Sequence, residues 1–134
     1  MRFGQANLDA ADEMDLRADR ERYEADRRKD LRLSATEGLD AALSAHRLDA
    51  LLFPGVSSAN IAARTGYPSV TVPWALLPVP AGTGAMAFPA GFTPKPAPFN
   101  VTFTGTRCSE PVLIRLAYAF EQATRKRQPP PDFP

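Results

Sequence analysis

The sequence predicts an α/β fold in which helices pack on a few buried strands, and it predicts that this fold is one part of a larger body. Charged residues gather at the front: sixteen lie between residues 9 and 32, but only two, Arg64 and Lys95, lie between residues 51 and 100. Capping signals place helices at both ends of the chain. Three short apolar strands between them need more sheet and more covering helix than the chain supplies.

Composition narrows the class of protein. The chain has 134 residues, 44% of them apolar and 23% charged, which is enough for about one domain. A net charge of +1 gives no reason to expect nucleic acid or an anionic membrane as a partner. The single cysteine, Cys108, excludes an internal disulfide and a zinc site with several cysteines. No apolar run resembles a signal peptide or a membrane span, so we expect a cytoplasmic protein.

The charged front, residues 5–47, is predicted to form two helices. Residues 5–33 are good helix formers with a thin apolar stripe, which is typical of a mostly solvated helix. Ser34 and Glu37 fit a capping box that would begin the second helix, in which Leu39, Leu43 and His46 share one face.

Residues 48–105 are predicted to hold the strands and a Pro/Gly-rich excursion. The apolar run 48–53, closed by Pro54 and Gly55, indicates a strand that is buried on both faces. A second strand, 69–72, is predicted to stop at Pro73, and residues 74–98 then form a long irregular excursion. Residues 99–105 alternate strictly and are predicted to pair with 69–72 in antiparallel fashion. Unpaired, these strands would expose one apolar patch, formed by Leu51, Phe53, Val70 and Val72.

The last helix is predicted over residues 110–127. Ser109 is in a capping position, Pro111 lies where its missing N–H costs nothing, and the basic triplet 125–127 suits the negative end of the helix dipole. Its apolar face comprises Leu113, Leu116, Ala117 and Phe120. A Pro-rich tail, residues 128–134, follows.

The chain shows no complete catalytic constellation. His46 is the sole histidine and has no nucleophile motif near it. Cys108 precedes a helix but lacks a second cysteine or a neighbouring histidine, which favours a packing role. Ser57 and Ser58 follow a strand, yet no G-x-S-x-G elbow surrounds them. We therefore predict no catalytic, cofactor-binding or metal-binding residue in this chain.

Four segments together resemble one known family. Residues 48–54, 62–73, 101–105 and 109–124 resemble, in order and spacing, the C-terminal part of amidase signature enzymes. The resemblance implies a large mixed sheet between helices and a serine amidohydrolase that cleaves carboxamide C–N bonds without metal or cofactor. It also implies a Ser–cis-Ser–Lys triad, which in the family lies upstream of the matched region, so that no triad residue maps onto this chain.

These observations favour one function over another. Residues 1–134 are interpreted as the C-terminal part of a single amidase domain, inactive alone, whose partner is the remainder of the amidase polypeptide and whose substrate is a small amide. The alternative is a stand-alone, non-catalytic protein that uses the remnant fold as a protein-interaction module. An open sheet edge is also compatible with a homo-oligomer. A reading frame that continues upstream of Met1 into a Gly/Ser-rich signature would favour the first interpretation.

Overall fold

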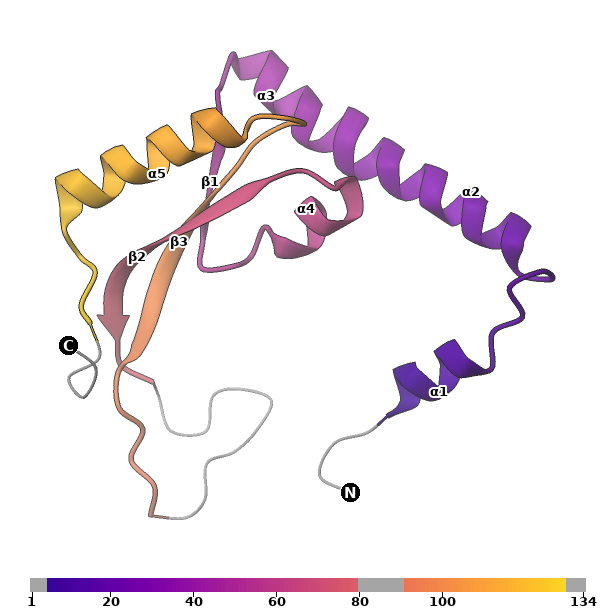
Figure 1. The fold of residues 1–134 in the computed structure, drawn as a ribbon, viewed down its shortest axis with the longest axis horizontal. Helices are drawn as coiled ribbons and strands as arrows, with labels where there is room; N and C mark the ends of the chain where they lie inside the picture. Colours follow the sequence, from indigo (N-terminus) through magenta and orange to yellow (C-terminus); the bar gives the residue numbers. More distant parts are fainter. Residues whose placement is uncertain (1–4, 80–90, 130–134) are drawn as a thin grey trace.

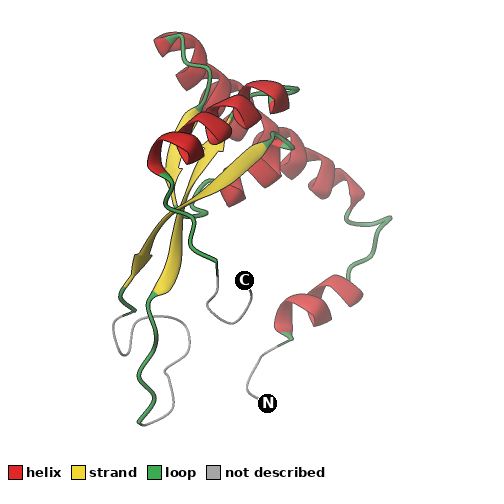
Figure 2. Ribbon diagram, turned by 60° about the vertical axis from the view of Figure 1, so that its left-hand side comes forward, coloured by secondary structure: helices red, strands yellow, loops and turns green. Residues whose placement is uncertain are grey.

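The computed structural model describes residues 5–79 and 91–129 of the chain. It is a mixture of helices and strands, as predicted, with α5 lying across one face of a small twisted sheet (Figures 1 and 2). In chain order the elements are α1 (Ala6–Asp12), α2 (Arg20–Leu31), the π-helical segment η1 (Arg32–Leu39), α3 (Asp40–His46), β1 (Leu51–Pro54), α4 (Ala59–Thr65), β2 (Ser69–Leu77), β3 (Ala97–Thr104) and α5 (Glu110–Thr124). None of the helices in the described ranges is long and apolar enough to cross a membrane.

The front of the chain differs from the predicted long helix over 5–33. The helix is broken because the Asp15 carboxylate accepts the backbone N–H groups of Arg17 at 2.8 Å and Ala18 at 3.0 Å, and this local turn competes with helix. These two hydrogen bonds hold the pKa of Asp15 below its ordinary value. As a result, α1 lies away from the rest of the fold, beyond the bend (Figure 1).

The predicted capping box is wrong. The helix runs without interruption from α2 through η1 into α3, and Ser34 is buried within it instead of preceding it. Glu37 does not reach back to Ser34 but pairs with Arg32, five residues earlier, at 2.8 Å. A π-helical turn bonds residue i to i+5, so it brings side chains at this spacing together. The buried face of η1 and α3 comprises Ser34, Ala35, Leu39 and Leu43.

The sheet has the order β1-β3-β2, with both pairs antiparallel, which confirms the predicted antiparallel pairing of residues 69–72 with 99–105. In the observed register Ser69 lies opposite Thr104. Gly105 donates its N–H to the carbonyl of Pro68, at 3.3 Å. Hydrogen-bonded and non-hydrogen-bonded residue pairs alternate along an antiparallel pair of strands. Counting from the Pro68–Gly105 pair, the backbone groups of Val70 and Val72 therefore bond to β3. Their alternating neighbours on β2 direct backbone groups to the open edge.

This alternation corrects the predicted stop at Pro73. Pro73 lies at an outward position, so its missing N–H costs the sheet no hydrogen bond, and β2 continues to Leu77. The register shifts between Pro73 and Ala75, and the far end of β2 pairs with Ala97. The excursion therefore begins after Leu77 rather than at residue 74; residues 80–90 of it lie outside the described residues.

Strand β1 is shorter and less buried than predicted. It begins at Leu51, and the side chain of Leu52 is 55% exposed, so the strand is not buried on both faces within the described structure. The predicted apolar patch is also wrong. Leu51 and Phe53 point to one face of the sheet, and Val72 points to the other, where it is 5% exposed.

Helix α4 was not predicted. It occupies the seven residues before Gly66, whose positive φ of 73° ends it in a left-handed turn that glycine adopts without strain. Ser58 and Gly66 are residue types that often flank helices, and they lie just before and just after α4. Seven residues, however, are too few to show a clear helical period of apolar residues in the sequence.

Helix α5 supplies the cover for the sheet. It ends at Thr124, before the basic triplet, because Arg125 is left-handed with φ 48°. The Ser109 hydroxyl does not cap the helix; it donates to the carbonyl of Thr106, at 2.7 Å. The predicted apolar face is confirmed where Leu113 and Ala117 are buried. Phe120 packs at 5.8 Å from Phe103 and 5.6 Å from Trp74, centroid to centroid.

Candidate functional site

The serines after β1 are not arranged as nucleophiles. Ser57 donates its hydroxyl to the carbonyl of Pro54, at 2.8 Å, which closes the turn after the strand. Ser58 is completely buried, and its hydroxyl has no hydrogen-bond partner within the described structure. A buried hydroxyl without a base within hydrogen-bond reach is not activated for attack.

His46 and Cys108 lie at separate places and do not meet these serines. His46 is the exposed last residue of α3. Cys108 is a free, exposed thiol in the β3–α5 turn, where its φ is 59°. Over residues 5–79 and 91–129, no group of three or more His, Cys, Asp or Glu side chains could hold a metal ion. The described residues therefore do not bring together a nucleophile, a base and an orienting acid.

One polar cluster joins helix α3 to the segments before β2 and after β3. Tyr67, before β2, donates its hydroxyl to one carboxylate oxygen of Asp40, at 2.7 Å. Thr106, after β3, donates to the other oxygen, at 3.0 Å. The hydrogen bond to Asp40 is the main reason that the pKa of Tyr67 is raised above its ordinary value of 10.0. The cluster ties the start of α3 to one end of the β2–β3 pair, where β2 begins and β3 ends.

The Tyr67–Asp40 hydrogen bond gives stability a defined pH dependence. Because the pKa of Tyr67 is raised on folding, its contribution is fully present below the unfolded pKa and is lost as pH rises through the folded one. Tyr67→Phe is expected to lower the free energy of unfolding by about 1 kcal/mol at pH 8, and by less at pH 11. Urea unfolding at both pH values measures this. Exposed Tyr23→Phe is the control, and an equal loss at both pH values would contradict the assignment.

A ladder of hydroxyls crosses one face of the sheet. Ser69 and Thr104 share a hydrogen bond of 2.9 Å, and so do Thr71 and Thr102. These are the non-hydrogen-bonded backbone pairs of β2 and β3, in which side chains approach most closely. Thr102 also donates to the carbonyl of Gly55, which fastens the turn after β1 to the sheet. Each of these hydroxyls has a structural partner, so the ladder stiffens the sheet.

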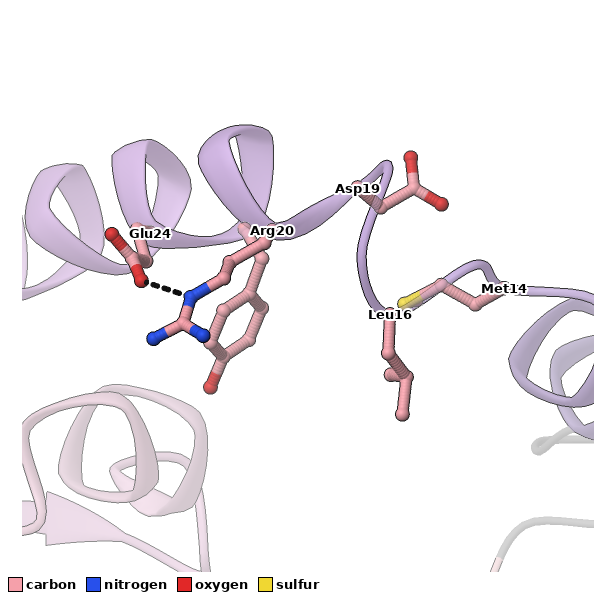
Figure 3. A pocket seen from close by; sticks show the side chains of 6 residues that line it. Met14, Leu16, Asp19, Arg20 and Glu24 are labelled. Atoms are coloured by element: carbon pink, nitrogen blue, oxygen red, sulfur yellow. Dashed lines mark hydrogen bonds and ion pairs between the residues drawn. The ribbon is translucent and has the colours of Figure 1, made fainter.

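Two concave surfaces among the described residues lie open to solvent. A pocket of about 380 Å³ lies at the bend between α1 and α2 (Figure 3). There Arg20 bonds Glu24 at 2.9 Å on the surface. The pocket is lined by Met14, Leu16, Asp19, Arg20, Tyr23 and Glu24. A groove of about 420 Å³ runs between β2 and α5 and is discussed below.

The front helices, α1 and α2, pack little of their surface against the rest of the described structure. Neither α1 nor α2 buries a single residue. Large apolar side chains on these helices and on the bend between them are exposed to solvent. Leu16 is 80% exposed, and Leu8 and Tyr23 are also exposed. Among the residues that the structure describes, β1 and β2 are the two edge strands of the sheet, each with one side of its backbone unpaired by another strand. Such surfaces mark sites of association with further protein.

Comparison with known proteins gives a consistent result. No sequence-family profile matches the chain. It is similar to a probable amidase of Arabidopsis thaliana, with 34% identity over 93 residues, and to a putative amidase of Arthroderma benhamiae, with 38% identity over 100 residues. It is also similar to the solved peptide amidase of Stenotrophomonas maltophilia, with 40% identity and a TM-score of 0.73. A peptide amidase in complex with the competitive inhibitor chymostatin gives 38% identity and a TM-score of 0.74.

The matches cover most of this chain and little of its relatives. The Arabidopsis and Arthroderma proteins match 69% and 74% of the chain, which spans only 15% and 17% of their lengths. The two peptide amidase structures match 96% of it, which is 25% and 26% of their chains. The part of those proteins that is similar is a C-terminal part.

Proposed function

The chain is a homologue of amidases and matches a C-terminal part of them, and on that premise we propose that it is the C-terminal segment of an amidase signature enzyme. One observation carries the proposal: 40% identity to a peptide amidase over 96% of the chain, in the same fold. The proposed enzyme hydrolyses a carboxamide C–N bond with water, releasing a carboxylate and ammonia. Its expected compartment is the cytoplasm.

In this proposal the chain alone is inactive. The family's Ser–cis-Ser–Lys triad and oxyanion donors belong to the part of the enzyme that the chain does not include. The arrangement of the described residues supports this. Lys29, Lys95 and Lys126 are all exposed. No hydrogen bond within the described ranges joins any of them to Ser57 or Ser58.

The segment's role is then to complete the fold of the enzyme. Its exposed front helices and open sheet edges are surfaces that the remaining polypeptide would cover. The same surfaces favour the alternative, a stand-alone interaction module, because an open edge can recruit another protein. Activity of the completed enzyme separates the two proposals.

The experiment is an ammonia-release assay with a peptide amide as substrate. The full chain alone is expected to release no ammonia above background. A chimera in which this chain replaces the matching C-terminal segment of the Stenotrophomonas peptide amidase is expected to release it. Turnover by the chain alone that disappears in Ser57→Ala or Ser58→Ala would overturn the proposal, and so would a chimera without activity beside an active parent enzyme.

A further inference from the structure

The groove between β2 and α5 has the features of a strand-binding site. Its volume is about 420 Å³. One wall is formed by residues 70–73 of β2, and the other by side chains of α5. The lining comprises Val70, Thr71, Val72, Pro73, Ile114, Ala117, Tyr118, Glu121 and Arg127.

The backbone of β2 presents hydrogen-bonding groups to the open edge beside this groove. In the observed register, the backbone N–H and C=O groups of Val70 and Val72 bond to β3. The backbone N–H and C=O groups of Ser69 and Thr71 therefore point away from β3, toward the open edge. Pro73 adds a carbonyl but no N–H. These groups can pair with an added strand along about five residues, until the register shift after Pro73 interrupts the ladder.

The helix wall presents apolar side chains above the same edge. Ile114 and Tyr118 lie one turn apart on α5, and both are exposed, Tyr118 at 64%. Ala117 is buried between them and the sheet, and its small side chain leaves the groove open. An extended segment in the groove would thus gain main-chain pairing from β2 and apolar contact from α5, the two terms that drive strand addition.

The opposite edge of the sheet lacks this combination. Gly55 donates its N–H to the carbonyl of Asn100, at 2.8 Å. Because hydrogen-bonded residues alternate along the strand, the backbone groups of Leu52 and Pro54 point away from β3. In the four residues of β1, Leu52 therefore offers the sole outward N–H. Helix α5 contacts β2 and β3, and Val72 beneath it is buried, whereas Leu52 on the same face stays exposed.

We propose that the β2–α5 groove holds an extended, apolar segment of the amidase polypeptide that lies outside this chain, added to β2 as a fourth strand. The inference rests on the proposed function. It commits to this occupant because this chain covers only 25–26% of the structural neighbours, so most of their polypeptide lies outside the matched part. Glu121 and Arg127 at the end of the groove carry opposite charges, so the site does not select for a strongly charged partner.

Residue-resolved hydrogen exchange tests the proposal directly. The full chain and the active peptide amidase chimera are compared. In the chain alone, the amides of Val70 and Val72 are expected to be protected, and those of Ser69 and Thr71 to exchange quickly. In the chimera, the Ser69 and Thr71 amides are expected to exchange at least about 100-fold more slowly, because a strand then covers them.

A pair of helix variants tests the apolar wall. In the chimera, Tyr118→Glu is expected to lower the melting temperature and to reduce ammonia release at least about tenfold, since it places a charge where the added segment packs. Ala119→Glu is the matched control: it lies on the same helix, is exposed and does not line the groove. Equal effects of the two variants would contradict the assignment.

The outcomes separate the two proposals. An active chimera in which Ser69 and Thr71 still exchange quickly overturns the strand-binding inference and leaves the proposed function intact. An inactive chimera overturns the proposed function, and the inference falls with it. If the full chain alone is a dimer in sedimentation with protected Ser69 and Thr71 amides, the occupant is a second copy and the inference is wrong.

Discussion

Leu113→Ala is expected to lower the free energy of unfolding of the full chain by about 3 kcal/mol, within the range of about 2–5 kcal/mol for buried leucines. Leu113 is 0% exposed and is the deepest anchor of α5 on the sheet. Truncation removes its apolar contacts and leaves a cavity that the short strands cannot close. Urea unfolding followed by the fluorescence of Trp74, the sole tryptophan, measures the change, because Trp74 packs on α5 through Phe120.

Ile114→Ala is the matched control for this variant. Ile114 is the next residue of the same helix, but it is 59% exposed. We expect its loss to stay below about 1 kcal/mol, since little apolar surface returns to water. If both variants unfold at the same urea concentration, α5 does not pack on the sheet as described.

Gly38→Ala is expected to destabilise the chain by about 1–3 kcal/mol, as forced overpacking does. In the interior of an ordinary α-helix, replacing Gly by Ala raises the free energy of unfolding by about 0.5–1 kcal/mol. The sign of the change in this free energy therefore distinguishes a π-helical turn from an ordinary α-helix at Gly38. A Cβ at Gly38 would lie 2.7 Å from the carbonyl oxygen of Leu33, a backbone atom that cannot move without opening the π-helical turn. Thermal unfolding followed by circular dichroism measures the effect.

Thr36→Ala is the control for the π-helical turn. Thr36 lies in the same segment, is exposed and is replaced by a better helix former. This variant should unfold at the same temperature as the parent chain or slightly above it. A stabilising effect of Gly38→Ala would show that the chain passes through residues 32–39 as an ordinary α-helix.

Sequence reasoning predicted the elements whose signals are local. The strict alternation before Gly105 and the apolar spacing from Leu113 to Phe120 each identify one element, and the structure has both. The antiparallel pairing of β2 with β3 was predictable because strands that follow one another without a crossover helix pair in antiparallel fashion.

The errors came from rules whose outcome depends on tertiary context. A proline ends a strand where its missing N–H would have to bond a neighbouring strand, and the side to which Pro73 turns its backbone is not written in the local sequence. Ser34 and Glu37 fit a capping box, but the stretch before them was already helical, so the helix had no free end to cap. The sixteen charged residues between Asp9 and Arg32 correctly indicated a solvated front of the chain, although not the bend at Asp15.

The candidate site shows the same division. Ser57 and Ser58 could be judged poor nucleophiles from the sequence because no elbow motif surrounds them. The β2–α5 groove could not be predicted, since it depends on which backbone groups of Ser69 and Thr71 point outward and on where α5 crosses. The cluster of Tyr67, Asp40 and Thr106 joins residues far apart in the chain, so no spacing rule would have found it.

The proposed role of this chain is to complete an amidase without having amidase activity alone. The most direct measurement is ammonia release from a peptide amide by three proteins assayed side by side: the full chain, the Stenotrophomonas peptide amidase without its matching segment, and the chimera that joins the two. Ammonia release is expected from the chimera and from neither part alone. Activity in the chain alone, or none in the chimera, would contradict it.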